Sequence, residues 1–361
     1  MKSAVKKEVI DPWSSEMPKD YFKIIKNFGL EKFEVSDFPE PNVLMRRKIV
    51  FAGRDLKRIS KCIKEKKKFY ALTGIMPTAD KVHFGTKSVI DMMVYFQKLG
   101  GEVYVLVADL EAAATRGIDL KTAKKRALEI HIPCYIALGL DAKKTKFYFQ
   151  SENKDVTSLA YELSNKATLN EYRGIYGNAE PPRIMASVLQ VADILYPQLK
   201  EEMPGIIPVG IDQDPHIRLT RDIVSRYKKK NFFQPSSINF KFLPALTGEK
   251  KMSKSENNSL YLLDSDDEIK RKVSRALTGG QKTLEEQKKK GGNPDKDMLF
   301  ELFRQHLIGD DVELKNREDD YKKGKISDSE NKKYATELLI AFMHDFKTKY
   351  ELAKKEVKKM F

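Results

Sequence analysis

Two lysines in a short lysine- and serine-rich segment are the residues whose chemical role the sequence indicates most clearly. Lys251 and Lys254 stand in Lys251-Met252-Ser253-Lys254-Ser255, directly after Leu246-Thr247-Gly248-Glu249-Lys250. Two ammonium groups in such a segment can meet a polyphosphate and stabilise the charge that builds up on a leaving pyrophosphate, and serines and backbone N–H groups add donors. The alternative is a solvated surface loop, which is common in a lysine-rich chain. The phosphate hypothesis therefore depends on partners elsewhere in the sequence.

A second candidate segment, from Pro77 to Thr86, follows an expected strand and precedes an expected helix. Ligands of open α/β sheets bind at such strand ends, where helix N-termini present unpaired N–H groups to phosphate. The imidazole of His83 can donate to a phosphate oxygen, and Gly85 lets an adenine approach the backbone closely. The hydroxyl of Thr86 is a further donor. One histidine and one glycine in a loop mean little alone, but together with the lysines they indicate an ATP site.

A third group of polar residues occupies two segments further along the chain. Gln190 and Asp193 lie in Gln190-Val191-Ala192-Asp193-Ile194-Leu195, and Asp212 and Gln213 lie in the polar run from Pro208 to Asp222. Asp212 and Gln213 can meet the charged groups of an amino acid and a ribose. The structural alternative for this run is a capped helix start, with Asp214 as the cap and Pro215 in the first turn. The two interpretations are compatible.

Strands and helices alternate around these segments. Apolar runs at residues 69–72, 103–107 and 146–149 predict buried strands, and helical patterns are expected at residues 21–28, 85–99 and 120–138. A short strand is expected at residues 46–51. This alternation predicts a parallel, doubly wound α/β sheet. After Asp264-Ser265-Asp266-Asp267 the pattern is helical throughout, which predicts an α/β domain at residues 1–265 and an all-helical domain at residues 266–361.

Composition restricts the class of protein. The chain has 361 residues, 41% of them hydrophobic and 33% charged, with a formal net charge of +15. This charge favours a polyanionic partner, although a generally lysine-rich proteome would produce it as well. The cysteines are Cys62 and Cys134, so zinc ribbons and CxxC redox sites are excluded, and a cytoplasmic location is expected. No apolar run reaches membrane-spanning length.

The motifs together resemble class I aminoacyl-tRNA synthetases, most specifically the tryptophanyl-tRNA synthetases of the archaeal–eukaryotic type. Residues 251–255 resemble the KMSKS signature of that class. Residues 83–86 resemble its HIGH signature, with Thr86 in place of the second histidine. The resemblance extends over nearly the whole chain and includes Pro12-Trp13, Arg46-Arg47, Gly53-Arg54-Asp55, Gly210 to Pro215, Leu277 to Gly280 and Gly291-Gly292-Asn293.

This resemblance implies a Rossmann-like catalytic domain and a helical anticodon-binding domain. It also implies ATP-dependent activation of L-tryptophan, transfer to tRNA(Trp) and a homodimer. Mg²⁺ would arrive with ATP, and no protein site for a metal is assigned. The implied catalytic residues are His83, Lys251 and Lys254. The implied ATP-binding residues are Gly74, His83, Gly85, Thr86, Asp212, Lys251, Met252, Ser253 and Lys254, and the implied tryptophan-binding residues are Glu111, Gln190, Asp193 and Gln213.

Two departures from the family pattern concern the indole. Archaeal–eukaryotic tryptophan enzymes place a tyrosine and a glutamine against it, where this chain has Leu72 and Leu106. The bacterial-like carboxylate of Asp193 is then expected to accept the indole N–H. The main rival is a tyrosyl-tRNA synthetase, but leucine at position 72 favours indole, which has one N–H and no acceptor. A synthetase-like tRNA-binding paralogue without activity is the non-enzyme alternative.

Overall fold

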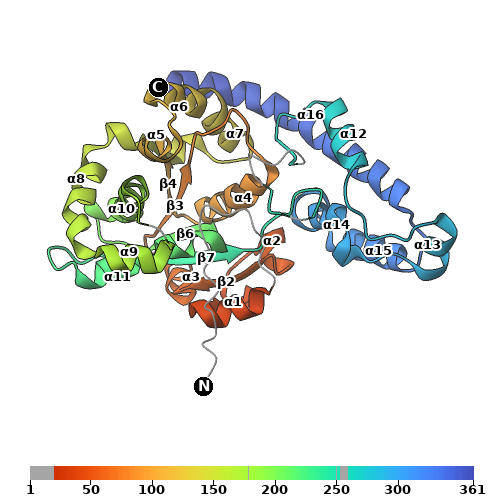
Figure 1. The fold of residues 1–361 in the computed structure, drawn as a ribbon, viewed down its shortest axis with the longest axis horizontal. Coiled ribbons are helices and arrows are strands. Elements are labelled where there is room, and N and C mark those ends of the chain that lie inside the picture. The colour runs from red at the N-terminus through yellow and green to blue at the C-terminus, as the bar shows by residue number, and fades with distance from the viewer. Residues whose placement is uncertain (1–19, 178, 249, 253–258) are drawn as a thin grey trace.

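The computed structural model describes residues 20–177, 179–248, 250–252 and 259–361. Ser253, Lys254 and the Pro12-Trp13 pair lie outside these ranges. Within the described residues, seven strands form one sheet in the order β1-β2-β7-β6-β3-β4-β5 (Figure 1). Their bounds are β1 Glu31–Lys32, β2 Val50–Arg54, β3 Tyr70–Ile75, β4 Glu102–Val107, β5 Thr145–Phe149, β6 Gly205–Gly210 and β7 Ser236–Phe240.

The strands from β7 to β5 are parallel, whereas β1 and β2 add an antiparallel edge. The helices before residue 265 are α1 Tyr21–Phe28, α2 Val43–Arg46, α3 Leu56–Lys64, α4 Phe84–Lys98, α5 Asp109–Arg116, α6 Leu120–Arg126, α7 Ile132–Ala137, α8 Lys154–Leu163, α9 Leu169–Tyr176, α10 Pro181–Leu195 and α11 Asp214–Arg226. Those after it are α12 Asp266–Ser274, α13 Leu284–Lys290, α14 Met298–Leu302, α15 Asp311–Lys322 and α16 Asp328–Met360.

Strand β4 is buried on both faces, as the continuous apolar run at 103–107 predicts. Successive side chains of a strand point to opposite faces. Accordingly, Val103, Val105 and Val107 of β4 pack in the apolar cluster of α3, α4 and α7. Tyr104 and Leu106 pack in a second cluster, with residues of α10 and α11. Helices therefore cover both faces, and the prediction of a doubly wound α/β sheet is confirmed.

Two predicted elements have different bounds in the structure. The strand expected at residues 46–51 begins only at Val50, because Arg46 ends α2 and Lys48 has a φ of 57°, which is incompatible with extended backbone. The helix expected at residues 120–138 is continuous, but a π-helical turn at Ala127–His131 joins α6 to α7. Apolar spacing predicts where a helix lies but does not reveal such a local change of hydrogen bonding.

The region after residue 265 is helical. Ser265 caps α12 through a capping box with Glu268, as the acidic start of this segment predicts. The 33-residue α16 runs from the helical group around α13 and α15 back to the sheet domain (Figure 1). There the hydroxyl of Tyr350 donates to the carbonyl of Glu129 at 2.8 Å, and Val357 joins the core beneath the sheet. None of the described helices is long and apolar enough to cross a membrane.

Candidate active site

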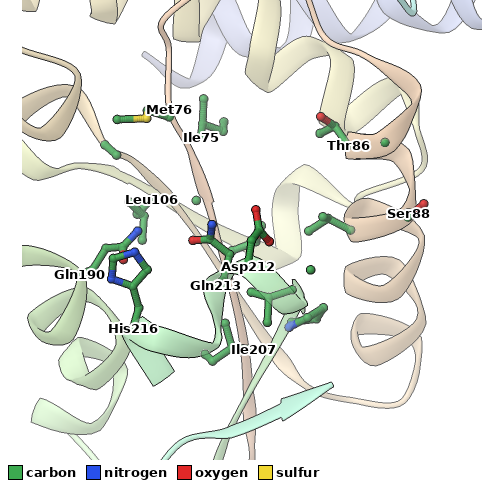
Figure 2. A pocket seen from close by; sticks show the side chains of 18 of the residues that line it. Ile75, Met76, Thr86, Ser88, Leu106, Gln190, Ile207, Asp212, Gln213 and His216 are labelled. Carbon is green, nitrogen blue, oxygen red and sulfur yellow. The ribbon is translucent and has the colours of Figure 1, made fainter. Parts of the chain in front are cut away.

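A cavity of about 840 Å³ opens at the carboxyl ends of the parallel strands. It lies where β3 continues to β4 on one side and neighbours β6 on the other, which is the switch point at which open α/β sheets bind ligands. In Figure 2, Asp212 and Gln213 lie in the middle, Gln190 and His216 lie together on one side, and Thr86 and Ser88 project from α4 on the other.

All of the site residues predicted from the sequence that fall within the described ranges line this cavity. Those expected at ATP are Gly74, His83, Gly85, Thr86, Asp212, Lys251 and Met252, and those expected at tryptophan are Glu111, Gln190, Asp193 and Gln213. They come from β3, α4, α5, α10, the segment after β6 and the start of the Lys/Ser segment. The predictions for Ser253 and Lys254 lie outside the described residues.

Backbone pairing holds the histidine segment against residues 260 and 261. His83 forms a β-bridge with Tyr261, and the amide of Phe84 donates to the carbonyl of Leu260 at 3.0 Å. His83 also stands at the N-cap position of α4. A Cβ added at Gly85 would lie 2.9 Å from Nδ1 of His83, so glycine at position 85 leaves room for the imidazole at the helix N-terminus.

Lys251 forms an ion pair with Asp212. Its Nζ lies 2.6 Å from Oδ2 of Asp212, and the two side chains are only 15% and 13% exposed. The same ammonium lies 5.0 Å from the ring centroid of Phe242. The two residues expected at the phosphates and at the ribose therefore meet directly, within the cavity that both line.

The segment that carries Asp212 and Gln213 is fixed by Asp214. The Arg54 guanidinium donates to both oxygens of this buried carboxylate, at 2.9 and 3.0 Å, and Nε of Arg218 lies 3.1 Å from it. Asp214 is the first residue of α11 and Gln213 occupies the N-cap position without a side-chain cap bond, so the expectation of Asp214 as the cap is wrong. A bidentate arginine holds this turn instead.

Two buried carboxylates share one amide in the wall of the cavity. Nε2 of Gln150 donates to Oε1 of Glu111 at 3.0 Å and to Oδ2 of Asp193 at 2.6 Å, and the Tyr148 hydroxyl donates to Oδ1 of Asp193 at 2.9 Å. Burial, with Asp193 nearby, raises the pKa of Glu111 to about 8. Burial also raises the pKa of Asp193, to about 7, although its bonds with Gln150 and Tyr148 oppose that shift.

Sequence analysis did not identify three polar residues of this region. Tyr148 lies within β5, a strand noted only for its apolar pattern, and Gln150 directly follows that strand. His216, on α11, lines the cavity and shares a hydrogen bond of 2.8 Å with the Tyr176 hydroxyl, and burial lowers its pKa to about 3, so its ring is neutral. The sequence signal available for Gln150 was a polar residue directly after a predicted strand, where ligands of open parallel sheets bind.

Comparison with known proteins identifies the family. The family model described as class I tRNA synthetases (W and Y) matches residues 64–344. This chain belongs to that family. The tryptophan–tRNA ligase of Methanocaldococcus jannaschii is 40% identical to this chain over 355 residues, covering 96% of each protein. The tryptophan–tRNA ligase of Hyperthermus butylicus is 38% identical, again with 96% of each covered.

Solved structures of tryptophanyl-tRNA synthetases share the fold. The crystal structure of the Aeropyrum pernix synthetase superposes with a TM-score of 0.89 at 38% identity, covering 97% of this chain and 98% of that one. The Encephalitozoon cuniculi synthetase, solved bound to tryptophan, has a TM-score of 0.81 at 27% identity over 93% and 95% of the two chains. The prediction of an archaeal-type tryptophanyl-tRNA synthetase, an aminoacyl-tRNA ligase with a Rossmann-like fold, is confirmed.

Proposed function

We propose that this chain activates L-tryptophan with ATP and transfers it to tRNA(Trp). The tryptophan carboxylate attacks the α-phosphorus of ATP, the bond from that phosphorus to the bridging oxygen breaks, and tryptophanyl-adenylate and pyrophosphate form. The terminal ribose hydroxyl of the tRNA then attacks the acyl carbon, and AMP leaves. The reaction needs no side-chain nucleophile, so the protein contributes positioning and electrostatic stabilisation.

The observation that carries this proposal is the convergence of the predicted residues on one cavity. Basic and hydrogen-bonding groups from the start of α4 and from Lys251 line it, and so do Glu111, Gln190 and Asp193. The first group suits polyphosphate and the second suits an amino acid. A protein that only binds tRNA requires neither.

In this proposal His83, Lys251 and Lys254 stabilise the phosphates, and Gly74, Gly85, Thr86, Met252 and Ser253 complete the ATP site. Asp212 lies near the ribose. Glu111, Gln190 and Gln213 hold the α-ammonium of tryptophan, and Asp193 accepts the indole N–H. Leu72 and Leu106, which are 3% and 5% exposed and line the cavity, supply apolar contact to the indole.

Mg²⁺ would accompany the ATP phosphates and offset their charge. We assign it no protein ligands. The enzyme would act in the cytoplasm as a homodimer. The helices from residue 266 onward would form the anticodon-binding domain, and its packing on Phe84 and α7 means that deleting it exposes apolar side chains of the catalytic domain.

ATP–pyrophosphate exchange measured separately with tryptophan, tyrosine and phenylalanine tests the function. We expect exchange with tryptophan and a background rate with the other two. The related proteins of Methanocaldococcus jannaschii and Hyperthermus butylicus are named tryptophan–tRNA ligases, which favours this outcome over the tyrosine alternative. Comparable exchange with tyrosine would contradict the tryptophan assignment, and no exchange with any amino acid would favour a tRNA-binding paralogue.

A further inference from the structure

Gln150 lies behind the tryptophan-binding wall of the cavity. Its side chain is fully buried, and it is absent from the residues that line the cavity, whereas Glu111 and Asp193 both line it. These two carboxylates are the ones assigned to opposite ends of tryptophan, Glu111 to the ammonium and Asp193 to the indole N–H. One NH₂ group of Gln150 donates to both.

We propose that Gln150 is a positioning residue that sets the amino-acid specificity of this enzyme, because its amide fixes the spacing between the carboxylate that holds the ammonium and the carboxylate that reads the indole. This inference rests on the proposed function and adds to it a residue that never touches the substrate.

The chemistry of an amide suits this role. A lysine or arginine at this position would be a permanent cation beside both carboxyl groups and would compete with the substrate ammonium for Glu111. An amide donates two N–H bonds and remains neutral. Gln150 and Tyr148 each donate one bond to a different oxygen of Asp193, so this carboxyl group retains acceptor capacity for an indole N–H.

The position of Gln150 is itself fixed by the backbone. Gln150 begins the 3₁₀ turn Gln150–Glu152 after β5, and β5 pairs in register with β4, which leads directly into α5 and Glu111. The amide of Glu111 donates back to Oε1 of Gln150 at 3.4 Å. The next residue anchors the same two segments, since the amide and hydroxyl of Ser151 both donate to the carboxylate of Asp109. The turn after β5 and the start of α5 therefore hold each other in place.

The test is the preference for tryptophan over β-(3-benzothienyl)alanine, in which sulfur replaces the indole N–H, measured as the ratio of kcat/KM in ATP–pyrophosphate exchange. Wild type should strongly prefer tryptophan. Gln150→Met, which keeps the length and removes both donors, should reduce kcat/KM for tryptophan about 10- to 100-fold, mainly through KM. The analogue makes no bond to Asp193, so its kcat/KM should fall less and the preference should shrink.

Gln150→Asn provides a second variant if the methionine form does not fold. It retains an amide but is too short to reach both carboxylates, so a smaller loss of preference is expected. Gln198→Met is the matched control, because Gln198 is equally buried and donates to the Tyr70 hydroxyl and to the Phe233 carbonyl. It should lose stability and keep the wild-type ratio.

The two proposals fail in different ways. If wild type shows no tryptophan-dependent exchange, the proposed function fails and this inference fails with it. A second set of results would overturn only this inference. In it, wild type prefers tryptophan, Asp193→Ala abolishes that preference, and both Gln150 variants keep the wild-type ratio and KM. Asp193 would then recognise the indole N–H without help from Gln150.

Discussion

At the scale of single residues, the partner of Lys251 determines what the lysine segment can do. Its ammonium meets Asp212 at 2.6 Å in a largely buried pair. A lysine that is to stabilise a leaving pyrophosphate must exchange this carboxylate for phosphate oxygens. Both partners are negatively charged, so the exchange keeps the ammonium paired and avoids the cost of an isolated buried charge.

Lys254→Ala should reduce kcat for adenylation about 10²–10³-fold, with a smaller effect on the KM for tryptophan, because a preorganised charge acts on the transition state. Lys251→Ala should act in the same direction, and less strongly. Single-turnover formation of adenylate measures both. Lys250→Ala is the control, since Lys250 is an exposed neighbour that does not line the cavity. A near-normal kcat in both test variants would mean that the segment is a solvated surface loop.

At the scale of elements, Arg47 joins the segment after α2 to the C-terminal helices. Its guanidinium donates to Oδ1 of Asp311 at 2.7 Å and to four carbonyl oxygens, which belong to Phe303, Arg304, Ile308 and Gly309. These carbonyls lie in and just after the π-helical turn Phe303–Leu307, where the last carbonyls of a helix lack intrahelical donors, although the Phe303 carbonyl also accepts from the amide of Ile308. The neighbouring Arg46 also binds Asp311 but is 38% exposed, compared with 9% for Arg47.

Arg47→Met should therefore lower the free energy of unfolding by at least about 2 kcal/mol, because it leaves several carbonyl groups without donors. Arg46→Met, which removes the same charge one residue earlier, should cost less than about 1 kcal/mol. Urea denaturation of both variants and wild type measures the difference. Equal losses in the two variants would mean that general charge, and not the guanidinium contacts of Arg47, stabilises this junction.

At the scale of the whole molecule, buried titratable groups link stability to pH in opposite directions. The pKa values of Glu111 and Asp193 are raised to about 8 and about 7 from ordinary values of 4.5 and 3.8. At pH values between the ordinary and the raised pKa values, the folded protein thus binds more protons than the unfolded chain. The free energy of unfolding therefore falls as pH rises through this range. The pKa of His216 is lowered from 6.5 to about 3, so between these values only the unfolded chain protonates this histidine. Its contribution therefore makes stability rise with pH, but only up to about pH 6.5.

Between pH 6.5 and about 8 the two carboxylates should then dominate over His216, and the Tm of the protein without added tryptophan should decrease as pH rises. Thermal melts across this range measure the slope. In Glu111→Gln the neutral amide removes one titrating group, and with it the repulsion that helps to keep a proton on the pair, so the slope should be shallower. Parallel slopes in wild type and variant would show that other groups control the pH dependence.

The sequence by itself determined the parts that depend on local patterns. The valine-rich run at 103–107, the acidic start of α12 and the spacing of apolar residues in α4 predicted strands, a helix start and a helix, because strand and helix periods are visible within a few residues. The segments around His83 and Asp212 could be placed at the sheet edge, since the carboxyl ends of parallel strands meet there, whereas Glu111, Gln190 and Asp193 were predicted only through the family resemblance.

Only the tertiary structure decided which of these residues touch. Gln150 reaches Glu111, 39 positions earlier, and Asp193, 43 positions later, because β5 lies beside β4 and α10 packs over the same face. Strand order, the antiparallel edge of β1 and β2, the π-helical turns and the contacts of Arg47 all depend on packing between distant segments. No local pattern encodes such contacts, since the energy that selects them arises only when the segments are buried together.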